Sequence, residues 1–261
     1  MIILGIKSAG PDTSATLIKD GKIVAASGED RFNREKHTSK FPEYAINFCL
    51  KNAYIEISDV DEVAIGMQWN KRAKSRFIYT LRTGGIYSIR KSIRLANEDF
   101  SRTRSAKNFF RKKSNYKGKI RFFDHYDCHA AAVYFASPYK SAAILSVDGA
   151  GEKSCTRIYK ASETKINNLF EVNFPNSIGS FYSLITKFLG FRIDWDEGKT
   201  MALAAYGAPA FYNKFDDIVR KDNKSVYKIN VDYFDFFRGK ENYYSPLFIN
   251  SFGSERKPKM L

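Results

Sequence analysis

The stretch Ile3-Leu4-Gly5-Ile6-Lys7-Ser8-Ala9-Gly10 returns, in altered form, as Ile144-Leu145-Ser146-Val147-Asp148-Gly149-Ala150-Gly151. The two copies align without a gap, and Ala15–Lys19 then falls against Thr156–Lys160 in the same register. Each copy predicts an apolar strand, a turn of small residues and a second strand. Any two β-hairpins with glycine turns share part of this pattern. Here the register holds from residue 3 to residue 19, which favours a true internal repeat.

A hairpin at the start of each half predicts a duplicated α/β fold with two lobes and a cleft between them. Actin-like ATPases, built from two ribonuclease H-like lobes, have this plan, and their small-residue turns let backbone N–H groups approach phosphate closely. We predict a first lobe over residues 1–123, with a basic helical insertion at about 70–115, and a second lobe over 124–261. The apolar pattern weakens after about Lys221, and residues 253–261 have the look of an interrupted loop, so the second lobe is predicted to be incomplete.

The remaining apolar pattern predicts where the other elements lie. A helix is expected from Pro42, since apolar residues recur at helical spacing after it. Further helices are expected at 70–115 (interrupted at Gly84-Gly85), 124–136, 180–189 and 201–206. Further strands are expected at Lys22–Ala26, Glu62–Gly66, Lys119–Phe123, Ala142–Val147, Thr156–Tyr159 and Leu169–Val172.

The bulk composition is that of a globular protein. Hydrophobic residues make up 44% of the chain and aromatic residues 15%, which is too apolar for a disordered protein. Apolar runs such as Ala142–Val147 are too short to span a bilayer. The start, Met1–Lys7, has no basic region before its apolar run, so it predicts an opening strand and not a signal peptide. Three widely spaced cysteines, an odd number, favour free thiols in a reducing cytoplasm.

The net charge of +15 is concentrated in one segment. Residues 70–115 hold 14 Lys or Arg against only Glu98 and Asp99. Such a concentration predicts an anionic partner, which would be a nucleic acid, a membrane surface or a phosphorylated substrate. The alternative is a solvated helical insertion without a ligand. Zinc-finger spacing and aromatic RNA-binding motifs are missing from the sequence, so a nucleic acid is the less favoured partner.

Two histidines and an aspartate form the clearest candidate metal site. His125 and His129 are four residues apart at the start of a predicted helix, so both imidazoles lie on one face. Asp148 ends a strongly apolar strand and is followed by glycines. Two imidazoles and one carboxylate suit Fe²⁺, Mn²⁺ or Zn²⁺ with positions left open for substrate. The alternatives are two capping or surface histidines and a plain Asp-Gly hairpin turn. Cys128 is expected to pack.

Two other polar stretches are candidate binding sites. Glu29–His37 is densely charged, so it is either a solvated loop or a source of Arg and Lys for phosphate or carboxylate groups. Gly198-Lys199-Thr200 contains part of a Walker A loop. Ile193 stands where that loop needs its first glycine, so a P-loop is excluded.

Together these motifs resemble the N-terminal domain of the nodulation- and antibiotic-type O-carbamoyltransferases, which share an actin-like domain with the tRNA threonylcarbamoyl transferases. The resemblance covers residues 1 to about 210 in the family's order. Its motifs are Leu4-Gly5-Ile6, Asp12-Thr13-Ser14-Ala15, Glu29–His37 with Phe41-Pro42, His125 with His129, Asp148–Glu152, Phe174–Ser183 and Gly198–Gly207.

The resemblance implies a chemistry and a set of site residues. A synthase-like domain would make carbamoyl-adenylate from carbamoyl phosphate and ATP, and the actin-like domain would pass the carbamoyl group to a hydroxyl of a small molecule or glycan. His125, His129 and Asp148 would hold Fe²⁺ or another divalent metal near the adenylate phosphate. Lys36 is implied as a catalytic residue that also reaches the carbamoyl-adenylate. The other residues implied in binding the adenylate are Gly149, Gly151 and Lys199.

Two departures from the family pattern affect this expectation. Pro11 stands where many members have a histidine before Asp12, so acceptor activation would fall to Asp12 or do without such a group. A synthase-like domain is absent from the chain, so the chain is expected to be a fragment, a remnant, or a split subunit whose missing part a separate chain supplies. Two alternatives stay open: a tRNA-modifying subunit, which Asp12-Thr13-Ser14-Ala15 and the basic segment favour, and a basic binding module without catalysis.

Overall fold

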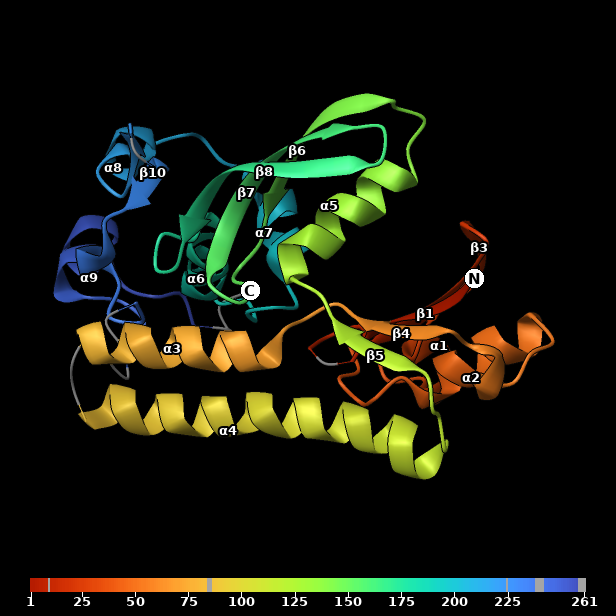
Figure 1. Cartoon of the computed structure of the whole chain (residues 1–261). Helices are drawn as coiled ribbons and strands as arrows, with labels where there is room; N and C mark the ends of the chain where they lie inside the picture. The colour runs from red at the N-terminus through yellow and green to blue at the C-terminus, as the bar shows by residue number, and fades with distance from the viewer. Residues whose placement is uncertain (9, 84–85, 224, 238–241, 258–261) are drawn as a thin grey trace. The chain divides into compact units, whose positions relative to one another are not determined.

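The computed structural model describes residues 1–8, 10–83, 86–223, 225–237 and 242–257 (Figure 1). The chain divides into two compact units. Unit 1 comprises Met1–Lys74 and Arg94–Cys128, and unit 2 comprises Ser75–Ile93 and His129–Leu261. The lobe boundary expected at residues 123 and 124 stays a prediction.

Strands and helices alternate along the chain, as in an α/β protein. The strands are β1 (Ile2–Lys7), β2 (Ser14–Lys19), β3 (Lys22–Gly28), β4 (Glu62–Ile65), β5 (Lys119–Phe122), β6 (Ser141–Val147), β7 (Ser154–Ser162), β8 (Lys165–Asn173), β9 (Val219–Asp222) and β10 (Val226–Ile229). The helices are α1 (Asp30–Asn33), α2 (Glu43–Asn52), α3 (Trp69–Thr83), α4 (Ile86–Asn108), α5 (His125–Phe135), α6 (Ile178–Phe188), α7 (Glu197–Ala204), α8 (Tyr212–Asp216) and α9 (Pro246–Phe252). Short 3-10 turns η1 (Ile57–Asp59) and η3 (Val231–Tyr233) and the π-helical turn η2 (Phe109–Lys113) complete the set.

Unit 1 is built on a five-stranded sheet of order β3-β2-β1-β4-β5. β1, β2 and β3 are antiparallel, whereas β4 pairs in parallel with both β1 and β5. This order is that of a ribonuclease H-like lobe, so the predicted α/β, actin-like architecture is confirmed. Alternate side chains of β1 and β4 are buried in a core that also contains the apolar side chains of α2, as expected for a sheet with one face on the core.

Glutamate 29 fixes the start of α2. Its side chain is buried, and its carboxylate accepts the backbone N–H groups of Tyr44 at 3.3 Å and Ala45 at 2.9 Å. A carboxylate at this position satisfies N–H groups that have no partner inside the helix and complements the helix dipole. This part of the charged stretch 29–37 is therefore structural.

Unit 2 contains a three-stranded antiparallel sheet of order β6-β7-β8. Its first hairpin repeats the first hairpin of unit 1 in exact register. Leu4 pairs with Leu17 in β1 and β2, and their aligned counterparts Leu145 and Ile158 pair in β6 and β7. The internal repeat is thus confirmed by strand pairing as well as by sequence. β7 and β8 are both longer than predicted, because their antiparallel pairing continues beyond the apolar residues on which the prediction rested.

The basic segment folds into α3 and α4, which run side by side in opposite directions (Figure 1). Near one end Thr103 Oγ1 donates to Asn70 Oδ1 at 3.3 Å, and near the other the hydroxyls of Thr80 and Ser92 form a hydrogen bond. The helical prediction for 70–115 is confirmed, with a π-helical turn at its end. The interruption expected at Gly84-Gly85 lies outside the described residues.

The chain after Lys221 is more ordered than its weak apolar pattern predicts. β9 and β10 form a hairpin, and α9 follows. The aromatic side chains of Phe234, Phe237 and Phe248 are buried among others of their kind. Irregularly spaced aromatic residues hold this part together, which explains why periodicity did not reveal it. Within the described ranges, every helix is too short or too polar to cross a bilayer.

Candidate metal centre

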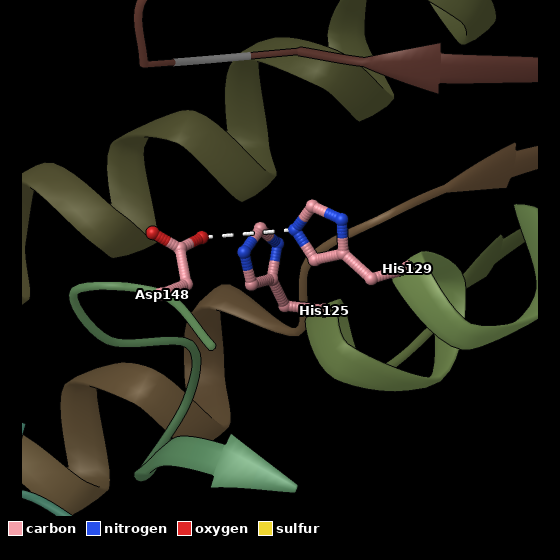
Figure 2. A group of neighbouring side chains, drawn as sticks. All are labelled: His125, His129 and Asp148. Atoms are coloured by element: carbon pink, nitrogen blue, oxygen red, sulfur yellow. Dashed lines mark ion pairs between the residues drawn. The ribbon is translucent and has the colours of Figure 1, made fainter. Parts of the chain in front are cut away.

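Helix α5 and the end of β6 bring the two predicted histidines and the predicted aspartate together. His125, His129 and Asp148 each offer one ligand atom, and these atoms lie within 4.8 Å of one another (Figure 2). His129 Nε2 is 3.6 Å from Asp148 Oδ2. The side chains of His129 and Asp148 are 51% and 47% exposed, so the cluster is open to solvent. Two imidazoles and a carboxylate with open positions fit a divalent transition metal.

The first turn of α5 is fixed by a capping aspartate. Asp124 Oδ1 accepts the backbone N–H of Tyr126 at 3.0 Å and that of Asp127 at 3.3 Å. Such a cap is worth about 1 kcal/mol and sets the residue at which the helix begins. The helix therefore begins at His125, and His129 follows one turn later on the same face. The division between the two units falls inside α5, between Cys128 and His129. The continuous helix therefore sets the spacing of the two histidines.

The loop that carries Asp148 is held by the start of α6. Ser177 Oγ donates to the carbonyl of Gly149 at 2.6 Å and lies 3.3 Å from the carbonyl of Asp148. The same hydroxyl accepts the backbone N–H of Ser180 at 2.9 Å, which caps α6. Ser180 Oγ adds a hydrogen bond to Gly149 at 3.3 Å. One serine thus fixes both the helix start and the metal-site loop.

Gly179 makes the closest backbone approach to this loop. A Cβ at Gly179 would lie 2.6 Å from the carbonyl carbon and oxygen of Asp148 and 2.7 Å from the nitrogen of Gly149. Backbone atoms at these distances leave no room for a side chain. The sequence motif Phe174–Ser183 therefore acts as a support for Asp148, a role that only the tertiary contact reveals.

Asp194 is a second carboxylate near the centre that sequence reasoning missed. Burial raises the pKa of Asp194, and the negative charges of Glu197 and Asp148 raise it further. Repulsion between neighbouring carboxylates disfavours their ionisation, and a bound cation offsets this repulsion. Asp194 also has a left-handed backbone, with φ of 64°. The sequence signal for it was the acidic run Asp194, Asp196 and Glu197 at the start of α7.

The cysteines are not part of this cluster. Cys128 Sγ lies 3.4 Å from where a Cβ at Gly66 would be, so it packs against the chain after β4, as expected. Burial raises the pKa of Cys155 to about 12, with a smaller opposing effect from Ser177. A thiol held in its protonated form is a poor metal ligand. The odd cysteine count therefore reflects buried or packed free thiols.

The two glycines expected to contact phosphate have local roles in the loop. The N–H of Gly149 donates to Asp148 Oδ1 at 2.6 Å, and a Cβ at Gly149 would meet only Ser180 Oγ at 3.8 Å. Gly151 is buried and its N–H donates to the Ser154 carbonyl at 3.0 Å. Their contact with phosphate stays a prediction.

Asp12 lies against His37, the histidine of the chain that is not in the candidate metal cluster. His37 Nδ1 is 3.2 Å from both carboxylate oxygens of Asp12. Both residues have left-handed backbones, with φ of 60° at Asp12 and 57° at His37, which is uncommon outside glycine and often marks functional sites. The two loops are joined by the Thr13 N–H to Thr38 carbonyl hydrogen bond of 3.3 Å. Sequence reasoning singled out Asp12 but not its partner.

The two predicted lysines differ in their surroundings. Lys36 is exposed in the turn before His37 and makes no ion pair with the residues that the structure describes. Lys199 lies in α7, and its Nζ is 2.9 Å from Oδ1 of Asp196, the residue directly before that helix. The Lys199 ammonium, followed by the backbone N–H of Arg192, lowers the pKa of Asp196 to about 2. Lys199 is therefore already neutralised by a carboxylate, and its role in a ligand site stays a prediction.

Comparison with known proteins identifies relatives over most of the chain. The family profile described as carbamoyltransferase N-terminus matches residues 2–256. The chain is 31% identical over 246 residues to the uncharacterized protein sll1178 of Synechocystis, a match that covers 91% of this chain and 40% of that protein. It is 30% identical over 223 residues to the nodulation protein NolNO of Sinorhizobium fredii, covering 85% of this chain and 32% of that protein.

The chain thus spans less than half the length of both relatives. Among solved structures, YeaZ from Pseudomonas aeruginosa aligns over 67% of this chain and 68% of its own, with 13% identity and a TM-score of 0.35. That score is too low to support an argument, and the family follows from the profile match. Because the profile covers nearly the whole sequence, the chain belongs to the carbamoyltransferase N-terminus family.

Proposed function

We propose that this chain is the actin-like part of an O-carbamoyltransferase, which moves a carbamoyl group from carbamoyl-adenylate to a substrate hydroxyl. The observation that carries the proposal is the cluster of His125, His129 and Asp148, in a chain of the carbamoyltransferase family. The adenylate would be made from carbamoyl phosphate and ATP by a synthase-like part, on the same or a separate chain. The acceptor would be a small molecule or a glycan in a biosynthetic route.

The metal would be Fe²⁺ or another divalent ion held by His125, His129 and Asp148. Such an ion, when bound, supplies a Lewis acid and a template for the adenylate phosphate. The donor set supports this assignment, since two imidazoles and a carboxylate favour first-row transition metals. The carboxylate of Asp194, whose pKa the charge of Asp148 helps to raise, adds negative charge that favours a cation.

Acceptor activation would fall to His37 with Asp12 as its partner. An Asp12 carboxylate on Nδ1 favours the tautomer that carries its lone pair on Nε2, the form that can accept a proton. The acceptor oxygen would attack the carbamoyl carbon as its proton passes to His37. The bond from that carbon to the phosphate oxygen would break, and AMP would leave. This pair would supply an imidazole in place of the histidine that many family members have directly before Asp12, where this chain has Pro11.

The remaining predicted residues would bind the adenylate. The exposed ammonium of Lys36 suits the carbamoyl-adenylate, because a lysine can stabilise negative charge on the phosphate. Lys199 would first have to release Asp196, which makes it the weaker candidate. Gly149 and Gly151 would let the loop after β6 approach phosphate.

Release of AMP from chemically prepared carbamoyl-adenylate tests this function. The metal-loaded chain should accelerate release in the presence of a polyol acceptor, and the His125→Ala/His129→Ala variant should not. Equal rates with both proteins would sink the transferase proposal. Activity that required a tRNA would instead favour the tRNA-modifying alternative.

A further inference from the structure

A second candidate site lies in unit 1, in the basic segment that the carbamoyl chemistry does not use. A cavity of about 410 Å³ is lined by Trp69, Asn70, Lys71, Thr103, Lys107 and Phe122. Pockets that hold small ligands have volumes of about 300–1,000 Å³. The cavity is therefore large enough for a small organic molecule.

The cavity lies beyond the carboxyl ends of two parallel strands. β4 and β5 pair in parallel up to Ile65 and Phe122. The chain after β4 leads into α3. Gln68 Nε2 donates to the Phe122 carbonyl at 3.2 Å, which joins the two strand ends. Parallel α/β sheets bind their ligands in crevices at this edge.

The lining of the cavity favours an anion. Lys71 and Lys107 both contribute ammonium groups, and neither makes an ion pair with any residue in the described ranges. The lining residues include no carboxylate. Trp69, Asn70 and Lys71 form the first turn of α3, which contains no acidic residue. Backbone N–H groups and the positive end of the helix dipole therefore add to the cationic lining.

Trp69 is an independent sign of a polar ligand. Only 3% of its surface is exposed, and its indole Nε1–H has no hydrogen-bond partner among the residues that the structure describes. A buried donor without a partner is rare in native proteins and calls for an explanation. Two cations lie close to its ring, with the Arg72 guanidinium 5.4 Å and the Arg102 guanidinium 5.1 Å from the ring centroid.

The carboxylates of the basic segment are already engaged. Asp99 is fully buried, and Arg102 Nη1 lies 3.5 Å from its Oδ1. Glu98 lies 3.9 Å from Arg94. The charges of Lys71 and Lys107 are therefore not neutralised from within the segment, and an external anion would serve that purpose.

We propose that this cavity binds a small organic phosphate. The phosphate would lie at the first turn of α3 between Lys71 and Lys107, and the apolar part of the ligand would pack against Phe122. Lys107 Nζ already lies 5.8 Å from the centroid of that ring. The basic segment would then be a small-molecule site and not a nucleic-acid surface.

Tryptophan fluorescence can report on the site directly, because the chain has only two tryptophans. In a Trp195→Phe background Trp69 is the sole reporter. Titration with AMP and with inorganic phosphate, at constant ionic strength, should give a saturable change in Trp69 emission. The response should persist in the His125→Ala/His129→Ala variant, which separates this site from the metal centre and from the proposed transferase activity.

Lysine variants test the assignment against a general effect of charge. Lys71→Met and Lys107→Met should each weaken binding about tenfold, the effect expected of a lost hydrogen bond to a charged group. Lys74→Met removes an exposed lysine of α3 that does not line the cavity, so binding should be unchanged. No saturable response would overturn the proposal. So would equal weakening by all three variants, or binding of a short RNA that all three weaken alike, because each points to a charged surface.

Discussion

Replacement of Gly179 by alanine should disturb the candidate metal centre without replacing any of its three residues. The new Cβ would lie 2.6 Å from the carbonyl carbon and oxygen of Asp148. That is roughly 1 Å closer than the optimal separation of about 3.5–4.0 Å. Since the neighbouring atoms are backbone, the loop must move. Overpacking of this kind costs about 1–3 kcal/mol, and misplaced support of a ligand lowers metal affinity about 10–100-fold.

Gly198→Ala is the matched control. Gly179 and Gly198 are each the second residue of a helix, α6 and α7, but a Cβ at Gly198 would meet nothing within 4 Å. Alanine is the better helix former, so this variant should be as stable as the parent or more stable by up to about 1 kcal/mol.

Urea unfolding and metal titration of both variants measure the two effects. Gly179→Ala should show a lower unfolding free energy and weaker metal binding, and Gly198→Ala should show neither. If Gly179→Ala bound metal with parental affinity, the loop would not depend on α6, and the reasoning from the close contact would be refuted.

Three further predictions concern single side chains. His37→Gln should lower the rate of carbamoyl transfer about 10²–10⁴-fold, whereas Asp12→Asn should have a smaller effect; transfer by His37→Gln at the parental rate would exclude His37 as the base. Iodoacetamide at pH 8 should leave Cys155 unlabelled in the folded protein, because its pKa is about 12 and it is buried, and should react first with Cys128; mass spectrometry after digestion shows the order. The pKa of Asp196, about 2, lies below the unfolded value of about 3.9. Its stabilisation should be complete above pH 4 and lost as the pH falls through 2, so the stability difference between the parent and Asp196→Asn should disappear across that window.

The sequence was sufficient to predict the features that depend on local pattern. The hairpin repeat was predicted in its correct register, because strand alternation and small-residue turns are both local signals. The helical spacing of His125 and His129 placed two candidate ligands on one face, and the apolar strand before Asp148 placed the third candidate at a strand end. Each of these inferences needs only a few neighbouring residues.

The features that sequence reasoning missed depend on tertiary contacts. The pairing of Asp12 with His37 joins residues far apart in the chain through two left-handed turns, which no periodicity predicts. Support of Asp148 by Gly179 arises from a backbone contact between a helix and a loop. The approach of Asp194 to Asp148 likewise depends on how the segment before α7 folds back.

The most direct test of the central claim is the metal content of the anaerobically purified chain beside that of the His125→Ala/His129→Ala variant. The cluster of two imidazoles and one carboxylate predicts close to one divalent transition metal per chain, with iron favoured, and loss of that metal in the variant. Absence of metal from both proteins, including after reconstitution with Fe²⁺, would contradict the account, and the chain would then have the fold of the family without a metal site.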